Sequence, residues 1–213
     1  MLRAGRPCAS SFHRVITPKT RKRSAQIDQY ARELAAERLL GRPLETIPSA
    51  AMTDGTERES QAVASYELTH GVDTELVGFL TTDDGRIGAS PDRIFDGGLL
   101  ETKNCKAHTH IGYLLGDGPD EDFRCQLQGQ LYVSGYPLVD IISCYPGLPD
   151  IVVRVRRDEE FIAELAGHLN YLCDTVDALM LRLAGMGYTP AEPEAEHDHS
   201  DHFLSEADGE AII

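Results

Sequence analysis

Four stretches of the chain carry apolar residues three and four positions apart, the spacing that lines one face of a helix. The first stretch ends at Gly41 and the third at Gly135, and glycine commonly follows the last turn of a helix. Asp158 precedes the fourth stretch as an expected cap, and Asp120 or Asp122 caps the third. The four predicted helices span residues 27–41, 53–71, 120–135 and 158–187.

Between these helices, short apolar runs separated by turn residues predict strands. Turns at 83–85 and 96–98 divide residues 75–105 into a predicted three-stranded meander, with strands at 75–82, 86–95 and 99–105, and residues 106–120 are expected to form a loop. Further strands are predicted at 138–145 and 150–157. This order of elements predicts an α/β fold in which helices flank one central mixed sheet.

Composition changes at residue 188. From there to residue 213 the chain consists mainly of Pro, Glu, Asp, His, Ser and Ala, a composition that cannot bury enough apolar surface to offset the entropy of ordering. We therefore expect a single domain over residues 1–187 and a disordered acidic tail over residues 188–213.

Charge is distributed unevenly around the net charge of −15. Residues 1–27 carry seven Lys and Arg residues and no acid, whereas residues 189–213 carry eight acids and no Lys or Arg. The asymmetry favours an amino-terminal segment that binds anions and a solvated tail. Two termini that serve only solubility would give the same pattern, so charge alone leaves both readings open.

Hydropathy and the placement of the cysteines indicate the cellular compartment in which the protein works. No apolar run reaches transmembrane length, and the first residues lack the continuous apolar region of a secretory signal. The five cysteines are scattered without a CxxC pair, which favours reduced thiols over a disulfide scaffold. We expect no membrane partner and a cytoplasmic location in a bacterial or phage-infected cell.

A polar group interrupts the predicted meander in GASPDRIFDGGLLETKNC, residues 88–105. Because side chains alternate across a strand, Glu101 and Lys103 should project from the same face, which they share with Leu99. Asp92 lies on the preceding strand, across a tight glycine turn. A hairpin therefore brings two carboxylates and one ammonium group together.

Carboxylate oxygens are the ligands that Mg²⁺ and Mn²⁺ prefer. An ammonium beside them can orient a metal-bound water or stabilise charge that develops on a phosphate. The pattern D-x8-E-x-K thus predicts metal-assisted phosphodiester hydrolysis. The alternative is a surface ion pair on a strand, which is common and contributes only ~0–1 kcal/mol.

The pattern SPD…LLETKNC resembles the core of the PD-(D/E)xK nuclease superfamily, and more narrowly the lambda exonuclease branch, the YqaJ-type viral recombinases. The resemblance spans roughly residues 3–185 and implies a restriction-endonuclease-like α/β core. Three further motifs carry it: GTERE at 55–59, RCQLQGQ at 124–130 and RAGRPCAS at 3–10. The chain departs from the family pattern at Arg93, where a glycine is usual, and in lacking a proline after ETKNC.

The resemblance implies a role for each matching residue. The implied metal ligands, for Mg²⁺ or Mn²⁺, are Glu59, Asp92, Glu101 and the backbone carbonyl of Thr102. Lys103 would position or help to deprotonate the attacking water, and Gln126 would lie near the metal. The residues implied to bind the 5′-phosphate or the DNA are Arg3, Ser10, Lys19, Arg21 and Ser90.

The resemblance also implies an activity and partners. It indicates a Mg²⁺-dependent deoxyribonuclease that digests double-stranded DNA from 5′ ends and leaves 3′ single strands for an annealing protein. A homotrimeric ring around the DNA is implied as well. Two alternatives stay open at this point: another PD-(D/E)xK endonuclease or repair nuclease, and a non-catalytic recombination protein that binds DNA ends.

Overall fold

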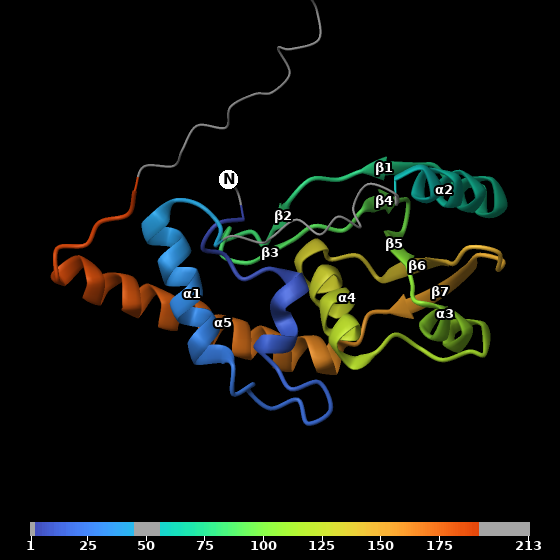
Figure 1. Ribbon diagram of the computed structural model, residues 1–213. Helices are drawn as coiled ribbons and strands as arrows, with labels where there is room; N and C mark the ends of the chain where they lie inside the picture. Colours follow the sequence, from blue (N-terminus) through green and yellow to red (C-terminus); the bar gives the residue numbers. More distant parts are fainter. Residues whose placement is uncertain (1–2, 45–55, 192–213) are drawn as a thin grey trace, which may run out of the picture.

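A five-stranded mixed sheet forms the centre of the computed structural model, which describes residues 3–44 and 56–191. The strand order is β1-β4-β5-β6-β7; the central β5–β6 pair is parallel, and its neighbours pair antiparallel. The strands are β1 (Thr74–Leu76), β4 (Arg93–Phe95), β5 (Gly98–Asn104), β6 (Leu138–Cys144) and β7 (Ile151–Arg156). The predicted α/β fold with a central mixed sheet flanked by helices is confirmed (Figure 1).

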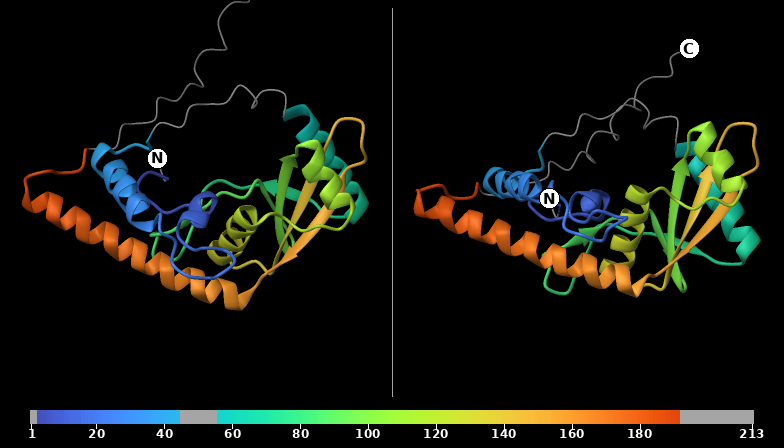
Figure 2. Two further views of the ribbon diagram at one scale, coloured as in Figure 1. Left: turned by 60° about the horizontal axis from the view of Figure 1, so that its bottom comes forward. Right: turned by 90° about the horizontal axis from the view of Figure 1, so that it is seen from below.

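Two helices cover opposite faces of this sheet (Figure 2). They are α2 (Thr56–His70) and α4 (Glu121–Ser134). Leu100 of β5 belongs to the core beneath α2, whereas Leu99 belongs to the core beneath α4. Because successive side chains of a strand point to opposite faces, Glu101 shares the α4 face with Leu99, as the sequence predicts.

A third core joins the amino-terminal segment to two long helices. Its elements are the 3-10 helix η1 (Ala9–Arg14), α1 (Ile27–Leu40) and α5 (Glu159–Gly185). Phe12 of η1 is fully buried and lies against α4 at Gly129, where an added Cβ would stand 2.3 Å from the Phe12 ring. The missing side chain at Gly129 therefore allows η1 to lie directly on α4, and this contact carries Ser10 to the α4 face of the sheet.

The helix ends follow the chemistry that the sequence indicates. Asp120 and Asp158 cap α4 and α5, each accepting a hydrogen bond from the backbone N–H three residues further on, at 2.8 and 3.0 Å. Gly41 and Gly135 follow α1 and α4 in the left-handed conformation that glycine adopts most readily. The four predicted helices are thus confirmed within one to three residues over the described part of the chain.

The predicted three-stranded meander is wrong. Residues 75–82 contribute to two strands rather than one, and residues 86–95 also divide into two. The additional short strands, β2 (Leu80–Thr81) and β3 (Gly88–Ala89), pair in a separate two-stranded sheet. Pro91 lies at the second break and lacks the N–H that a continuous ladder requires. The break leaves Ser90 and Asp92 in an irregular segment between the two sheets.

The loop predicted for residues 106–120 contains a helix, α3 (Ala107–Leu114). Its expected signals are absent, because Lys106 at the cap position makes no side-chain capping bond. One inward position is also polar: His110 is fully buried, 2.9 Å from the Ser143 hydroxyl and 3.1 Å from the Pro149 carbonyl. A hydrophobic pattern does not reveal this helix, because one of its buried positions is a hydrogen-bonded histidine and not an apolar residue.

Some predictions fall on residues outside the described part of the chain. They are the start of the second predicted helix, residues 53–55, and the acidic tail from residue 192 onward. The division into a domain and a tail therefore stays a prediction. Among the helices of the described ranges, none has both the length and the apolar character needed to cross a lipid bilayer.

Candidate active site

Strand β5 places a buried glutamate and a half-exposed lysine side by side. The Lys103 ammonium lies 2.9 Å from Glu101 Oε1, and Glu101 is only 2% exposed. The same ammonium stands 4.9 Å from the centre of the Phe123 ring of α4, which orients the lysine stem by a cation–π contact. The alternative of an exposed ion pair is therefore excluded for Glu101, which is inside the molecule.

Helix α4 supplies two amide donors to the same carboxylate. Gln126 donates from Nε2 to Glu101 Oε1 at 3.1 Å, and Gln130 donates to Oε2 at 3.0 Å. The two glutamines are four residues apart and so lie on one face of the helix. Both carboxylate oxygens of Glu101 are thus held in position by donors from α4, with the lysine as the single cation among the three.

Asp92 reaches β5 from the irregular segment between the two sheets. Its Oδ2 accepts hydrogen bonds from the Thr102 backbone N–H at 2.8 Å and from the Thr102 hydroxyl at 3.0 Å. These bonds fix Asp92 beside the residue that follows Glu101. The hairpin predicted to bring Asp92, Glu101 and Lys103 together has different strand boundaries, but the three side chains do gather around β5.

Electrostatics around Glu101 favour a cation. Burial raises the pKa of the Glu101 carboxyl above its usual range, and the charge of Asp92 raises it further, while Lys103 acts in the opposite direction. Within the described residues, no three His, Cys, Asp or Glu side chains come close enough together to hold a metal ion by themselves. The acidic donors here are two carboxylates, and two carboxylates completed by water and phosphate oxygens suit Mg²⁺ or Mn²⁺.

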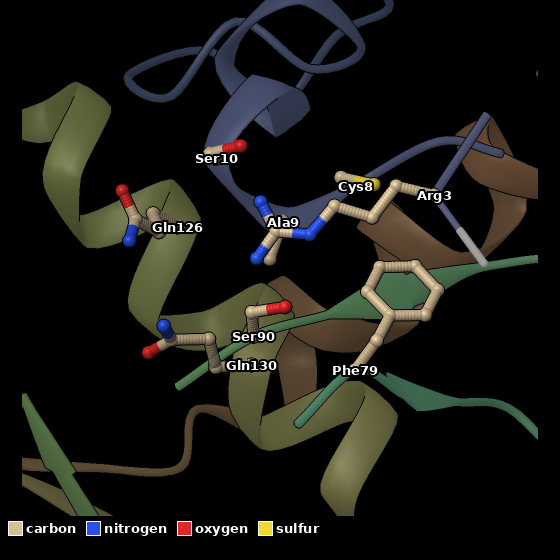
Figure 3. Close-up of a pocket in the computed structure, with 8 residues that line it drawn as sticks. All are labelled: Arg3, Cys8, Ala9, Ser10, Phe79, Ser90, Gln126 and Gln130. Atoms are coloured by element: carbon tan, nitrogen blue, oxygen red, sulfur yellow. The ribbon is translucent and has the colours of Figure 1, made fainter. Parts of the chain in front are cut away.

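A narrow cavity of about 80 Å³ adjoins this cluster. Its walls come from the amino-terminal segment, the break before β4 and α4 (Figure 3). The lining residues are Arg3, Cys8, Ala9, Ser10, Phe79, Ser90, Gln126 and Gln130. Figure 3 shows the Arg3 guanidinium extending between Ser10 and Ser90 toward the two glutamines.

Two buried polar atoms at this cavity have no hydrogen-bond partner among the residues that the structure describes. They are the Ser90 hydroxyl oxygen and Gln130 Oε1. An unpaired buried polar group costs about 1–3 kcal/mol, so a pair of them beside a cation points to a polar ligand that supplies the missing bonds. A cavity that holds an arginine, two serines and no carboxylate on its wall suits an anion.

The structure gathers most of the predicted site residues but not all of them. Arg3, Ser10 and Ser90, predicted to bind the 5′-phosphate, line one cavity. Lys19 and Arg21 do not line it, and Arg21 instead donates a hydrogen bond to Glu160 at the start of α5, at 3.2 Å. Their assignment to DNA binding stays a prediction.

Glu59 and the Thr102 carbonyl also stay predictions. Glu59 is half-buried on α2, the helix that covers the face opposite Glu101, and it is not gathered with Asp92 and Glu101 into a three-carboxylate group. The Thr102 backbone is fixed next to Asp92 by the bonds described above.

Sequence reasoning gave Gln130 too little weight. It is 1% exposed, it holds Glu101, and its carbonyl oxygen lacks a partner at the cavity. The available signal was its i, i+4 spacing from Gln126, which predicts that both side chains reach the same target. Phe123, three residues before Gln126, lies under Lys103 by the same helical logic.

The chain resembles known proteins over most of its length. A model of the YqaJ-like viral recombinase domain matches residues 1–137. The alkaline exonuclease LHK-Exo from Laribacter hongkongensis is 29% identical, with a TM-score of 0.74, over 87% of this chain and 94% of that one. A structure of LHK-Exo in complex with dAMP gives 30% identity and a TM-score of 0.75 with the same coverage.

A phage-related exonuclease from Haemophilus somnus 129PT shares the fold. It is 16% identical, with a TM-score of 0.62, over 84% of this chain and 96% of that one. No curated protein sequence matches. The residues matched by the family model include the amino-terminal segment, β5 and α4, which form the cavity and the Glu101 cluster.

Proposed function

Because this chain belongs to the YqaJ-like viral recombinase family, we propose that it is a metal-dependent exonuclease that digests double-stranded DNA from 5′ ends and leaves 3′ single strands. The family match and the similarity to LHK-Exo support a phage-type exonuclease. The observation that supports this polarity and metal dependence is the adjacency of two features: a buried carboxylate–lysine pair and a cavity in which the Arg3 guanidinium lies beside the unpaired Ser90 hydroxyl.

Asp92 and Glu101 would hold Mg²⁺ or Mn²⁺, with Glu59 and the Thr102 carbonyl as further proposed ligands. The bound cation would supply Lewis-acid stabilisation of the negative charge that develops on the phosphate. The protein prepares the place for it by keeping Glu101 buried, where a carboxylate charge is costly without a nearby cation.

Lys103 is proposed to position the attacking water and to help remove its proton. Its ammonium is fixed between Glu101 and the Phe123 ring, so it has one preferred direction toward the carboxylate cluster. The positive charge of the ammonium favours loss of the water proton. The water oxygen adds to phosphorus and gives up that proton, the bond from phosphorus to the 3′ oxygen breaks, and the 3′ oxygen takes up a proton and leaves as a hydroxyl. Gln126 keeps the Glu101 carboxylate in place throughout.

Arg3, Ser10 and Ser90 are proposed to bind the terminal 5′-phosphate. Cleavage at the 3′ oxygen releases a 5′-mononucleotide and leaves a new 5′-phosphate on the shortened strand, so one cavity can serve every cycle. LHK-Exo in complex with dAMP supports this assignment, since dAMP is such a product. The cavity holds room for several water-sized groups, enough for a phosphate but not for a nucleoside.

A time course on a linear duplex labelled at its 5′-phosphate tests the proposal. We expect release of labelled mononucleotide in Mg²⁺ or Mn²⁺ and none in Ca²⁺ or with a chelator. A matched 5′-hydroxyl duplex should be degraded more slowly, and covalently closed circles should stay intact. Nicking of circles would indicate an endonuclease, and DNA-end binding without any cleavage would indicate a non-catalytic recombination protein.

The partners belong to the same proposal. The 3′ strand would be passed to a single-strand annealing protein in the cytoplasm, and three copies would form a ring around the DNA. A ring would explain how a protein of net charge −15 stays on DNA, because topology then replaces a strong electrostatic attraction. Light scattering of the purified protein measures this directly, and a monomer that digests processively would contradict the ring.

A further inference from the structure

Both backbone polar groups of Gly5 form hydrogen bonds with side chains of two consecutive α1 residues. Its N–H donates to Glu37 Oε2 at 2.8 Å, and its carbonyl accepts from Arg38 Nε at 2.9 Å. Gly5 has φ +68°, and an added Cβ would stand 2.2 Å from Arg38 Cγ. The position thus requires glycine twice over, for its backbone conformation and for the close approach of Arg38.

Gly5 lies in the turn that presents Arg3 to the anion cavity. The Arg6 N–H donates to the Arg3 carbonyl at 3.2 Å, which closes a four-residue turn with Gly5 in its third position. A positive φ at that position is the signature of a type II turn. The Arg3 guanidinium itself lies 5.8 Å from the Phe79 ring centroid, a loose contact, so its direction depends on where the turn holds its backbone.

The hydrogen bonds that hold this turn extend through Arg38 to α5. Arg38 also donates from Nη1 to Asp177 of α5 at 2.6 Å, and the other oxygen of Asp177 accepts from Arg86 at 2.8 Å. Burial alone would raise the pKa of Asp177, but the hydrogen bonds and charges of the two arginines outweigh it and lower the pKa. Arg38 is therefore hydrogen-bonded at two of its nitrogens, to the Gly5 carbonyl and to Asp177, and these bonds fix its orientation.

We propose that Glu37 and Arg38 are positioning residues that set Arg3 for recognition of the 5′-phosphate, a role separate from the cleavage chemistry around Glu101. This inference rests on the proposed function, because it assigns a task within the proposed phosphate cavity. It explains why a glycine stands two residues after the arginine that enters the cavity. Neither α1 residue lines that narrow cavity, although Glu37 lines the wider groove that shares Arg3 and Ser10 with it. Arg38 lines neither of the two, so its proposed effect on phosphate recognition passes through the turn.

Arg38→Lys is the most informative substitution. Lysine keeps the positive charge near Asp177 but has one ammonium group, which cannot serve the Gly5 carbonyl and Asp177 in the forked geometry of a guanidinium. Arg32→Lys is the matched control, because Arg32 lies on the same helix, is exposed and lines a different groove between α1 and α5. Thermal melting of both variants checks that they are folded.

The readout is the ratio of initial rates on 5′-phosphorylated and 5′-hydroxyl duplexes. We expect Arg38→Lys to lower this ratio about tenfold through a higher KM for the phosphorylated duplex, with kcat at saturation unchanged. Arg32→Lys should leave the ratio at the wild-type value. In an Arg3→Ala background, Arg38→Lys should have no further effect on the ratio, because the residue that it positions is already gone.

Glu37 gives an independent check by conservative rescue. Glu37→Gln keeps an oxygen that can accept from the Gly5 N–H, so it should retain most of the phosphate preference, whereas Glu37→Ala should lose it. A purely structural role would lower the activity on both duplexes equally in every variant, and that result would overturn the inference. An additive loss in the Arg3→Ala background would overturn it as well.

The wild-type ratio separates this inference from the function on which it rests. If the wild-type protein digests both duplexes at the same rate, the phosphate cavity is misassigned. Both the proposed phosphate recognition and the positioning role of Glu37 and Arg38 are then overturned. If the wild-type protein prefers the phosphorylated duplex and Arg38→Lys keeps that preference, only the positioning role of Arg38 is overturned.

Discussion

Two buried carboxylates lie on the neighbouring central strands and face opposite sides of the sheet. Glu101 of β5 faces α4 and is 2% exposed, whereas Asp140 of β6 faces α2 and is fully buried. Each has a cation and further hydrogen-bond donors within reach. Burial and a cationic partner are thus common to both, yet only one of them adjoins the anion cavity.

The Asp140 cluster is closed. Arg154 donates to both carboxylate oxygens, from Nε at 2.8 Å and from Nη2 at 2.7 Å, and the Tyr66 hydroxyl adds a third bond at 2.7 Å. The carboxylate raises the pKa of the Arg154 guanidinium still further above neutral pH, so Arg154 stays positively charged under all ordinary conditions. These hydrogen bonds hold α2 against the sheet and link β7 to β6.

The Glu101 cluster is open. Its cation is a lysine, its other donors are amides, and one of these amides has an unpaired oxygen at the cavity. A lysine can release or accept a proton where an arginine cannot. A buried carboxylate alone therefore does not indicate a candidate active site, whereas unused hydrogen-bonding capacity around it does.

The largest expected effect is on activity at the open cluster. Lys103→Met keeps the apolar stem over Phe123 but removes the ammonium, and we expect the cleavage rate to fall by about 10²–10⁴-fold with DNA binding retained. Arg154→Met, its counterpart on the other face, should leave the rate per folded molecule unchanged. Single-turnover cleavage with a filter-binding assay measures both, and equal losses in the two variants would erase the proposed distinction.

The closed cluster should show the largest effect on stability. Arg154→Met leaves Asp140 buried without its cation, and breaking a buried pair in this way costs about 3–5 kcal/mol. We expect a loss of about 3 kcal/mol, because the Arg154 side chain is 45% exposed and solvent partly screens its charge. Urea unfolding monitored by circular dichroism gives the value; a loss below ~1 kcal/mol would mean that the pair is not structural.

Tyr66→Phe should have a smaller effect on the same cluster. It removes one hydrogen bond to a charged acceptor while Arg154 still satisfies both oxygens of Asp140, so we expect a loss of about 1.5 kcal/mol. Activity at saturating DNA should not change. Urea unfolding of this variant together with the Tyr66→Phe/Arg154→Met double variant measures the coupling, and strict additivity would show that the three groups do not act as one network.

How much of this could be read from the sequence differs between the two clusters. Alternation along β5 predicts the shared face of Glu101 and Lys103, and helical spacing predicts that Gln126 lies on the inner side of α4. These relations are local, so a pattern of two or four residues is enough. The helix ends were predicted correctly from capping aspartates and terminal glycines for the same reason, because these signals are also local.

Relations between distant segments were not accessible in this way. Nothing in the spacing indicates that Asp140 meets Arg154 on the next strand, because that pairing depends on the antiparallel register of β6 and β7. The break at Pro91, which sends β3 and β4 to different sheets, also depends on tertiary packing that overrides local strand propensity. The grip of Arg38 on Gly5 joins residues 33 positions apart and has no pattern of its own.

The smallest expected effect tests the open cluster through stability rather than activity. Glu101→Gln removes a desolvated charge and keeps the shape of the side chain, so the metal-free variant should have a higher Tm than the metal-free wild type at neutral pH. The sign follows from the raised pKa: the folded protein favours the protonated carboxyl, so the wild type is most stable below the ordinary value near 4.5 and loses stability as the pH rises from there to the raised pKa. The advantage of the variant should therefore disappear on acidification to about pH 4. Melting curves in chelator across this range measure it, and an advantage that stays constant with pH would mean that Lys103 already offsets the buried charge.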